Sequence, residues 1–100
     1  MSNAAATARA EMRIQYGGLL AILDKRDADL AFVDATIATH SRVARRGRDR
    51  RMRRTVVREF NVDAWRIRDA ARIYHAAGVI SDVERTALLE RAAVKEGSHV

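Results

Sequence analysis

The stretch LLAILDKRDADLAFVDATIA, residues 19–38, sets the expected architecture because its apolar residues recur every three or four positions. This spacing places them along one narrow line of an α-helix, which resembles the seam of a coiled coil. The line consists of Leu19, Leu23, Leu30, Val33 and Ile37, and it continues to Ala44. We therefore expect one long helix from about Thr7 to Arg46.

This line also predicts association with a second copy of the chain. A chain of 100 residues buries only a modest core, so a long helix with an apolar line is expected to need a partner. We expect a homo-oligomer, first of all a dimer, with the line from Leu19 to Ile37 as its interface. Arg26 and His40 interrupt the line, and Gly17-Gly18 favour an alternative in which a helix–loop–helix breaks at the glycines.

The remainder of the chain is expected to form three shorter helices, which makes the fold all-α. A break near Gly47 precedes a second helix over about 49–60, which carries apolar residues on one side and arginines on the other. Asn61 is a suitable N-cap for a third helix that ends at Gly78. The last two helices should then form a hairpin.

The turn of this hairpin has a recognisable sequence. Ser81 and Glu84 have the spacing of a capping box, which opens a fourth helix that runs to about Lys95. Residues 73–89, with IYHAAGVISDVE followed by a Leu pair, resemble the short C-terminal helical hairpin called SHOCT, although Arg85 stands where that module has an aromatic residue. The resemblance implies oligomerisation or docking.

Composition indicates a single cytoplasmic domain. The chain has no proline and no cysteine, and it has neither a linker, a repeat nor an apolar run that could span a bilayer. We expect a flexible start over 1–7, one helical domain over 8–96 and a flexible end over 97–100. No membrane partner is expected.

Positive charge is concentrated in one segment. The net charge is +6, and residues 42–60 contain nine arginines and only two acidic residues. Arginine supplies seventeen of the nineteen basic residues, a bias typical of bacterial or phage genomes that does not explain the clustering. Residues 42–58 resemble the arginine-rich motifs of nucleic-acid-binding proteins, and phosphate would relieve the repulsion among them.

A single tryptophan lies near this segment. Trp65 has Arg68 and Arg72 three and seven positions later, which suits stacking on an unpaired base or anchoring a protein interface. Because most lone tryptophans are largely buried, a core position against the second helix or another subunit is the favoured interpretation. The residues expected to contact DNA or RNA are Arg42, Arg45, Arg46, Arg48, Arg50, Arg51, Arg53, Arg54, Arg58, Trp65, Arg68 and Arg72.

Catalysis is not expected. His40, His75 and His99 do not have the spacing of metal ligands, and the serines and glycines form neither a nucleophile motif nor a phosphate loop. We expect no catalytic residue, metal or cofactor. The predicted function is that of a nucleic-acid-binding accessory protein in nucleoid organisation, packaging or transcription; the alternative is an adaptor or inhibitor that docks its basic segment on an acidic protein.

Overall fold

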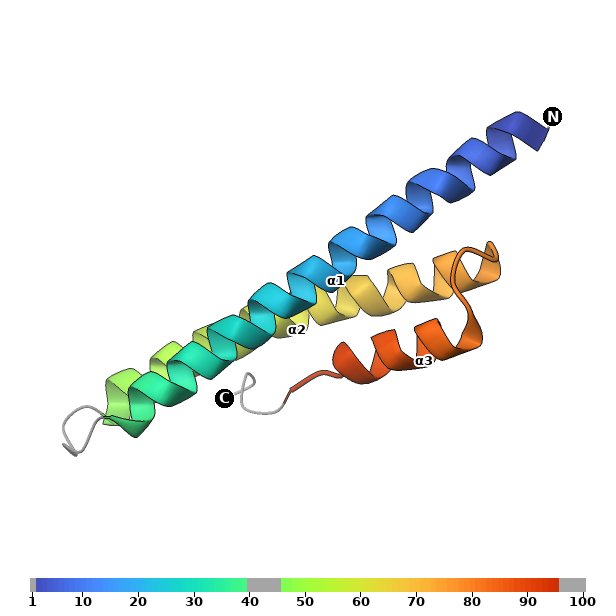
Figure 1. The fold of residues 1–100 in the computed structure, drawn as a ribbon. Coiled ribbons are helices and arrows are strands. Elements are labelled where there is room, and N and C mark those ends of the chain that lie inside the picture. Colours follow the sequence, from blue (N-terminus) through green and yellow to red (C-terminus); the bar gives the residue numbers. More distant parts are fainter. Residues whose placement is uncertain (1, 40–45, 96–100) are drawn as a thin grey trace.

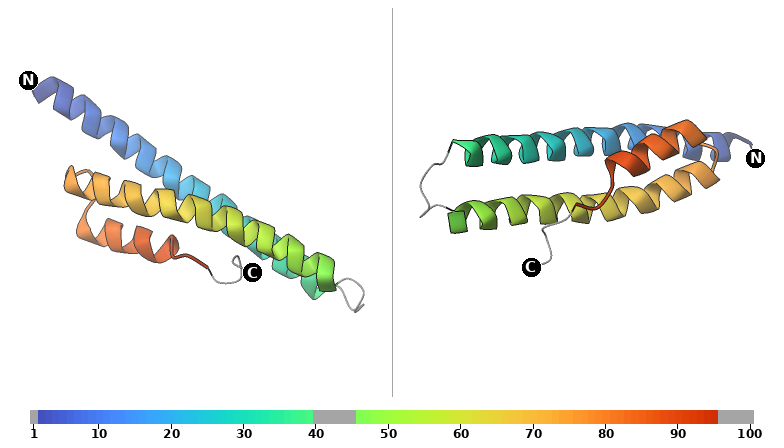
Figure 2. Two further views of the ribbon diagram at one scale, coloured as in Figure 1. Left: turned by 180° about the vertical axis from the view of Figure 1, so that it is seen from behind. Right: turned by 90° about the horizontal axis from the view of Figure 1, so that it is seen from below.

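The chain folds into a long helical hairpin with a third, shorter helix packed on it (Figure 1). A computed structural model describes residues 2–39 and 46–95, and these residues form α1 (Ser2–Ala38), α2 (Arg46–Ala76) and α3 (Asp82–Arg91), with no strand among them. α1 and α2 lie side by side and antiparallel, and α3 folds back along the C-terminal half of α2 (Figure 2). The molecule is a rod of 64 × 20 × 20 Å.

α1 is longer at its start and shorter at its end than predicted. It begins at Ser2, so residues expected to be flexible form its first turns, and it ends at Ala38 and not near Arg46. Its 37 residues span about 55 Å. The helix passes through Gly17-Gly18, so the predicted alternative of a break there is wrong. The buried Tyr16 and the partly buried Leu19 flank the glycines and hold the helix against the core.

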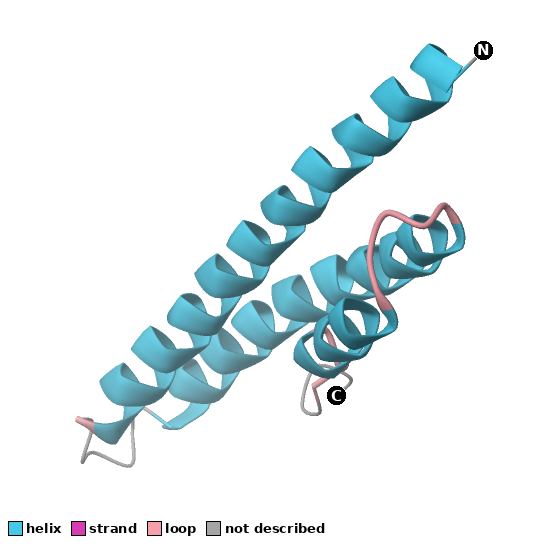
Figure 3. Cartoon of the chain, turned by 45° about the vertical axis from the view of Figure 1, so that its right-hand side comes forward, coloured by secondary structure: helices cyan, strands magenta, loops and turns pink. Residues whose placement is uncertain are grey.

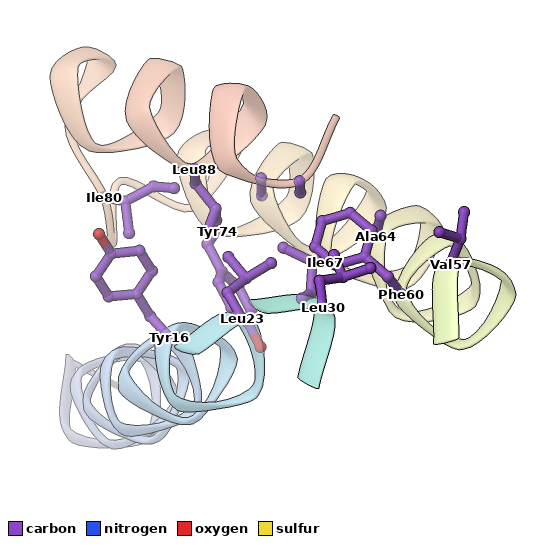
Figure 4. Packing of buried hydrophobic residues seen from close by; sticks show 12 residues of the cluster. Tyr16, Leu23, Leu30, Val57, Phe60, Ala64, Ile67, Tyr74, Ile80 and Leu88 are labelled. Atoms are coloured by element: carbon purple, nitrogen blue, oxygen red, sulfur yellow. The ribbon is translucent and has the colours of Figure 1, made fainter. Parts of the chain in front are cut away.

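The predicted oligomer interface is used within one chain. Leu23, Leu30 and Val33 are 1%, 8% and 4% exposed in the single chain, while Leu19 and Ile37 are partly buried. Figure 4 shows the side chains of Leu23 and Leu30 directed toward those of α2. The apolar spacing correctly indicated a covered face, but α2 covers it. Oligomerisation stays a prediction, and it would require another surface.

α2 is one continuous helix where two were predicted. Its buried apolar residues follow one another three or four positions apart without interruption: Val57, Phe60, Ala64, Ile67, Ala71 and Tyr74. Residues at this spacing share one side of a helix, so a single apolar line packs against both α1 and α3. The predicted break between the second and third helices is therefore wrong.

Asn61 anchors the C-terminal segment and does not cap a helix. It lies inside α2 and is 7% exposed. Its Nδ2 donates a hydrogen bond to the Lys95 carbonyl at 2.9 Å, and the Lys95 amide donates to Asn61 Oδ1 at 2.7 Å. α3 ends at Arg91, four residues before its predicted end, and these two hydrogen bonds hold the following segment on α2 at Lys95.

The turn from α2 to α3 confirms the predicted glycine stop (Figure 3). Gly78 has φ of +74°, a conformation that glycine adopts without strain. The Val79 amide donates to the Tyr74 carbonyl at 2.9 Å, and the Gly78 amide donates to the His75 carbonyl at 3.0 Å. This pair of hydrogen bonds is a Schellman motif, which satisfies the last carbonyls of α2.

The predicted capping box is also present. The Glu84 amide donates to Ser81 Oγ at 3.1 Å, and the Ser81 amide donates to Glu84 Oε1 at 3.0 Å. The Glu84 carboxylate also forms an ion pair with Arg13, with 2.7 Å between Oε2 and Nη2, which connects the start of α3 to α1. The hydrogen bond from Arg13, followed by that from the Ser81 amide, lowers the pKa of Glu84 from 4.5 to about 2.

Ion pairs flank the apolar interfaces. Arg26 of α1 contacts Asp63 at 2.6 Å and Glu59 at 3.1 Å, both on α2. Arg91 of α3 contacts Asp24 at 2.8 Å and Asp27 at 3.1 Å, both on α1. The hydrogen bond to Asp63 raises the pKa of Arg26. Arg26, which interrupts the apolar line in sequence, therefore lies at the edge of the interface and is paired there.

We expect Glu84→Gln to remove a pH-dependent part of the stability. A carboxyl group with a depressed pKa stabilises the folded state above its unfolded pKa of about 4.5, and this contribution is lost as pH falls toward about 2. Glutamine retains the capping box but not the charge. Urea unfolding across this range should show that the difference in free energy of unfolding between the wild type and the variant shrinks as pH falls. A difference that does not change with pH would contradict the role of this carboxylate.

Candidate nucleic-acid interface

The side of α2 that faces away from α1 carries a line of arginines and the tryptophan. Arg51, Arg58, Trp65 and Arg72 follow one another at seven-residue intervals, close to two helical turns, and Arg54 lies beside them. We call these five residues the outer line of α2. Arg51, Arg58 and Arg72 are exposed and Arg54 is partly exposed. From Arg51 to Arg72 the line spans about 32 Å.

The arginines at the start of α2 have no acidic partner within the described part of the chain. Among residues 2–39 and 46–95, no ion pair or side-chain hydrogen bond involves the guanidinium groups of Arg48, Arg50, Arg51, Arg54 and Arg58. Asp34, near the end of α1, pairs instead with Arg53 at 3.0 Å. The result is a dense positive surface over the first turns of α2.

Two predicted arginines have roles within the fold. Arg53 joins α2 to α1 through Asp34, with the two side chains 44% and 55% exposed. Arg68 is partly buried and directs Nη1 toward the Leu89 carbonyl of α3 at 3.4 Å. Arg68 therefore lies toward α3 and away from the outer line, which corrects its predicted place beside Trp65.

Arg72 remains on the surface although it is paired. It contacts Asp69, one turn earlier on α2, at 2.8 Å, and both side chains are largely exposed. Exposed pairs of this kind contribute little to stability. A phosphate group can therefore compete with Asp69 for this guanidinium at small cost.

Part of the predicted segment lies outside the described residues. Arg42 and Arg45 lie there, between α1 and α2, together with His40. His99, near the C-terminus, also lies outside the described residues. Arg46 opens α2, but its side chain is not described. The described part of the predicted segment forms the opening turns of α2 and not a separate basic helix.

Trp65 is a surface residue. Its side chain is 64% exposed, so the favoured interpretation as a core residue is wrong for the single chain. Val62, one turn earlier, is 47% exposed and places an aliphatic side chain next to the indole. Together they form a small apolar surface between Arg58 and Arg72.

Arg66 belongs to the same surface and was missed from sequence. It is exposed, and no ion pair involves it among the described residues. Arg58, Val62 and Arg66 follow at four-residue intervals, so on one continuous helix they are neighbours. The predicted break at Asn61 assigned Arg58 and Arg66 to different helices and concealed this relation.

The described residues contain neither a group of metal ligands nor a membrane-spanning helix. Within 2–39 and 46–95, no three His, Asp or Glu side chains are grouped to hold a metal ion. No helix in these ranges is long and apolar enough to cross a membrane. No protein family, curated protein or solved structure matches this chain.

The exposure of Trp65 predicts the fluorescence of the protein, because the chain contains one tryptophan. The folded and the urea-unfolded protein should have nearly the same emission maximum, and acrylamide should quench both with similar efficiency. Circular dichroism would confirm that the protein without urea is helical. A clearly blue-shifted and protected indole in the folded protein would contradict the exposed position of Trp65.

Proposed function

We propose that the protein binds nucleic acid along the outer line of α2, mainly through the phosphate backbone. The observation that carries the proposal is the group of guanidiniums at Arg48, Arg50, Arg51, Arg54 and Arg58, which have no ion pair within the described chain. Charged side chains this close repel one another, and a polyphosphate relieves the repulsion while releasing its counterions.

The position of these arginines strengthens the argument. Arg48 and Arg50 lie near the start of α2, where the helix dipole is positive and favours anions over cations, and Arg51, Arg54 and Arg58 follow in the next turns. Only Asp49 supplies an acidic residue in the first turn. Phosphate groups bound here interact favourably with both the guanidiniums and the helix dipole.

Trp65 adds a second mode of contact. Successive side chains of the outer line lie along one straight helix, with the exposed indole about 10 Å beyond Arg58. A strand whose phosphates contact Arg51 and Arg58 can place an unpaired base on the indole. Contacts of this kind give affinity with little sequence specificity. This mode of binding suits an accessory role in nucleoid organisation, packaging or transcription.

A matched pair of double variants tests the arginines. Arg51→Gln/Arg58→Gln removes two charges from the outer line, whereas Arg9→Gln/Arg85→Gln removes two exposed charges on α1 and α3. Binding to random-sequence duplex DNA and to single-stranded RNA is measured across a salt series. For duplex DNA, the first variant should lower the slope of log K against log salt by about 1.8, about 0.9 for each lost phosphate contact, and the second should leave it nearly unchanged.

Two outcomes would contradict the proposal. An equal decrease of the salt slope in both double variants would mean that net charge, and not the outer line of α2, governs binding. Absence of binding at low salt by a protein that circular dichroism shows to be folded would exclude nucleic acid as the partner. An acidic protein surface would then be the partner to test.

Trp65→Ala separates stacking from phosphate contact. We expect it to weaken binding of single-stranded RNA by about 1–3 kcal/mol, the usual contribution of a stacked base. Duplex DNA, whose bases are already stacked on one another, should bind almost as before. Trp65→Phe retains an aromatic ring and should restore most of the loss. Equal weakening for both nucleic acids would show that Trp65 does not stack on an unpaired base.

A further inference from the structure

The face of α1 that points away from α2 is exposed and largely apolar. Residues at three- and four-residue spacing form a line along this face, interrupted by the charged Lys25 between Ala21 and Ala28. We call its other members the outer line of α1: Ala10, Ile14, Gly17, Ala21, Ala28 and Phe32. Every one of these residues is exposed, and the two large ones, Ile14 and Phe32, are 76% and 71% exposed. The two large side chains lie 18 positions apart, about 27 Å along the helix, and small residues occupy most of the face between them.

Gly17 has no packing role within the chain. A glycine inside a helix costs about 1 kcal/mol relative to alanine. A Cβ placed on Gly17 would meet no atom within 4 Å, as would one on the neighbouring Gly18, so packing in the single chain does not require a glycine at either position. Close approach of another molecule to this point of α1 would explain the glycine.

The first turns of α1 also lack a partner. α1 extends beyond the end of α2 at the N-terminus (Figure 1), and residues 3–11 are all exposed. These turns continue a helix that is packed from Met12 onward. A partner along the outer face of α1 could cover the protruding turns as well.

We propose that the partner is a second copy of this chain, packed antiparallel along the outer line of α1 with the two-fold axis at Ala21. In this register each large residue faces a small one. Ile14 lies opposite Ala28 of the second copy, and Phe32 lies opposite its Ala10. Large side chains facing small ones allow two helices to interdigitate, and the match is self-complementary, as a two-fold interface requires.

The same register accounts for the glycine and for the protruding turns. Gly17 lies opposite Lys25 of the second copy, whose long aliphatic stem can cross a position without a side chain. Thr7 lies opposite Ala35 of the second copy, so the C-terminal half of one α1 covers the protruding turns of the other. This face lies opposite to the side of α1 that contacts α2, so the interface does not depend on nucleic-acid binding.

Single cysteines test the register, since the chain contains none. Ala21→Cys places two thiols together at the two-fold axis, and a short thiol-specific crosslinker should convert most of the protein to dimer. Ala35→Cys is equally exposed, but its counterpart lies 28 positions along the paired helices, about 42 Å away, so this variant should dimerise without being crosslinked. Crosslinking of both variants would indicate a parallel arrangement, and crosslinking of neither would indicate a monomer; both outcomes overturn the proposal.

Sedimentation equilibrium provides a second test without crosslinking. Ala21→Glu places two carboxylates face to face at the axis and should weaken dimerisation roughly tenfold or more. Ala76→Glu, at an exposed position at the end of α2, is the matched control and should leave the equilibrium unchanged. Circular dichroism shows whether each variant is folded. A wild-type chain that sediments at 11.2 kDa at every concentration, or equal weakening by both substitutions, would overturn the proposal.

Discussion

The structure depends on the continuity of α2. One uninterrupted apolar line, from Val57 to Tyr74, packs against α1 and α3 at once. Because this line faces inward over its whole length, the opposite side of the helix faces solvent over the same length, and residues from Arg51 to Arg72 share one surface. A break in the middle of the helix would rotate the two halves independently, and Trp65 would no longer lie in line with the arginines. The candidate binding surface is thus a direct consequence of how the core is packed.

The distribution of ion pairs determines where positive charge remains. Asp24 and Asp27 of α1 are paired with Arg91 of α3, and Glu59 and Asp63 of α2 are paired with Arg26 of α1. These pairs lie along the middle of the rod, where three helices meet. Toward the start of α2 only two helices remain, and the Asp34 carboxylate pairs with Arg53 there. The excess of positive charge is therefore greatest at the end of the molecule where α2 begins.

Local signals in the sequence predicted local structure well. The stop at Gly78 and the capping box from Ser81 to Glu84 need only neighbouring residues, and both are present. The apolar spacing of α1 correctly indicated which face is covered, but spacing alone does not identify what covers it, and α2 does so in place of a second copy. Asn61 was misassigned for a non-local reason: its amide is satisfied by the Lys95 backbone, 34 positions away. Arg66 was missed because it follows that misassigned residue.

The two outer lines lie on opposite sides of the hairpin, and this has a geometric consequence for the assembly. In a dimer joined through the outer line of α1, the two α1 helices occupy the centre and each α2 lies outside its own α1. The outer lines of the two α2 helices then face away from each other, with two helices between them. One continuous stretch of nucleic acid along one α2 would not reach the other without bending around the rod. Such a dimer would hold two separate segments together, which is the geometry of a bridging protein and differs from that of one that clasps a single site.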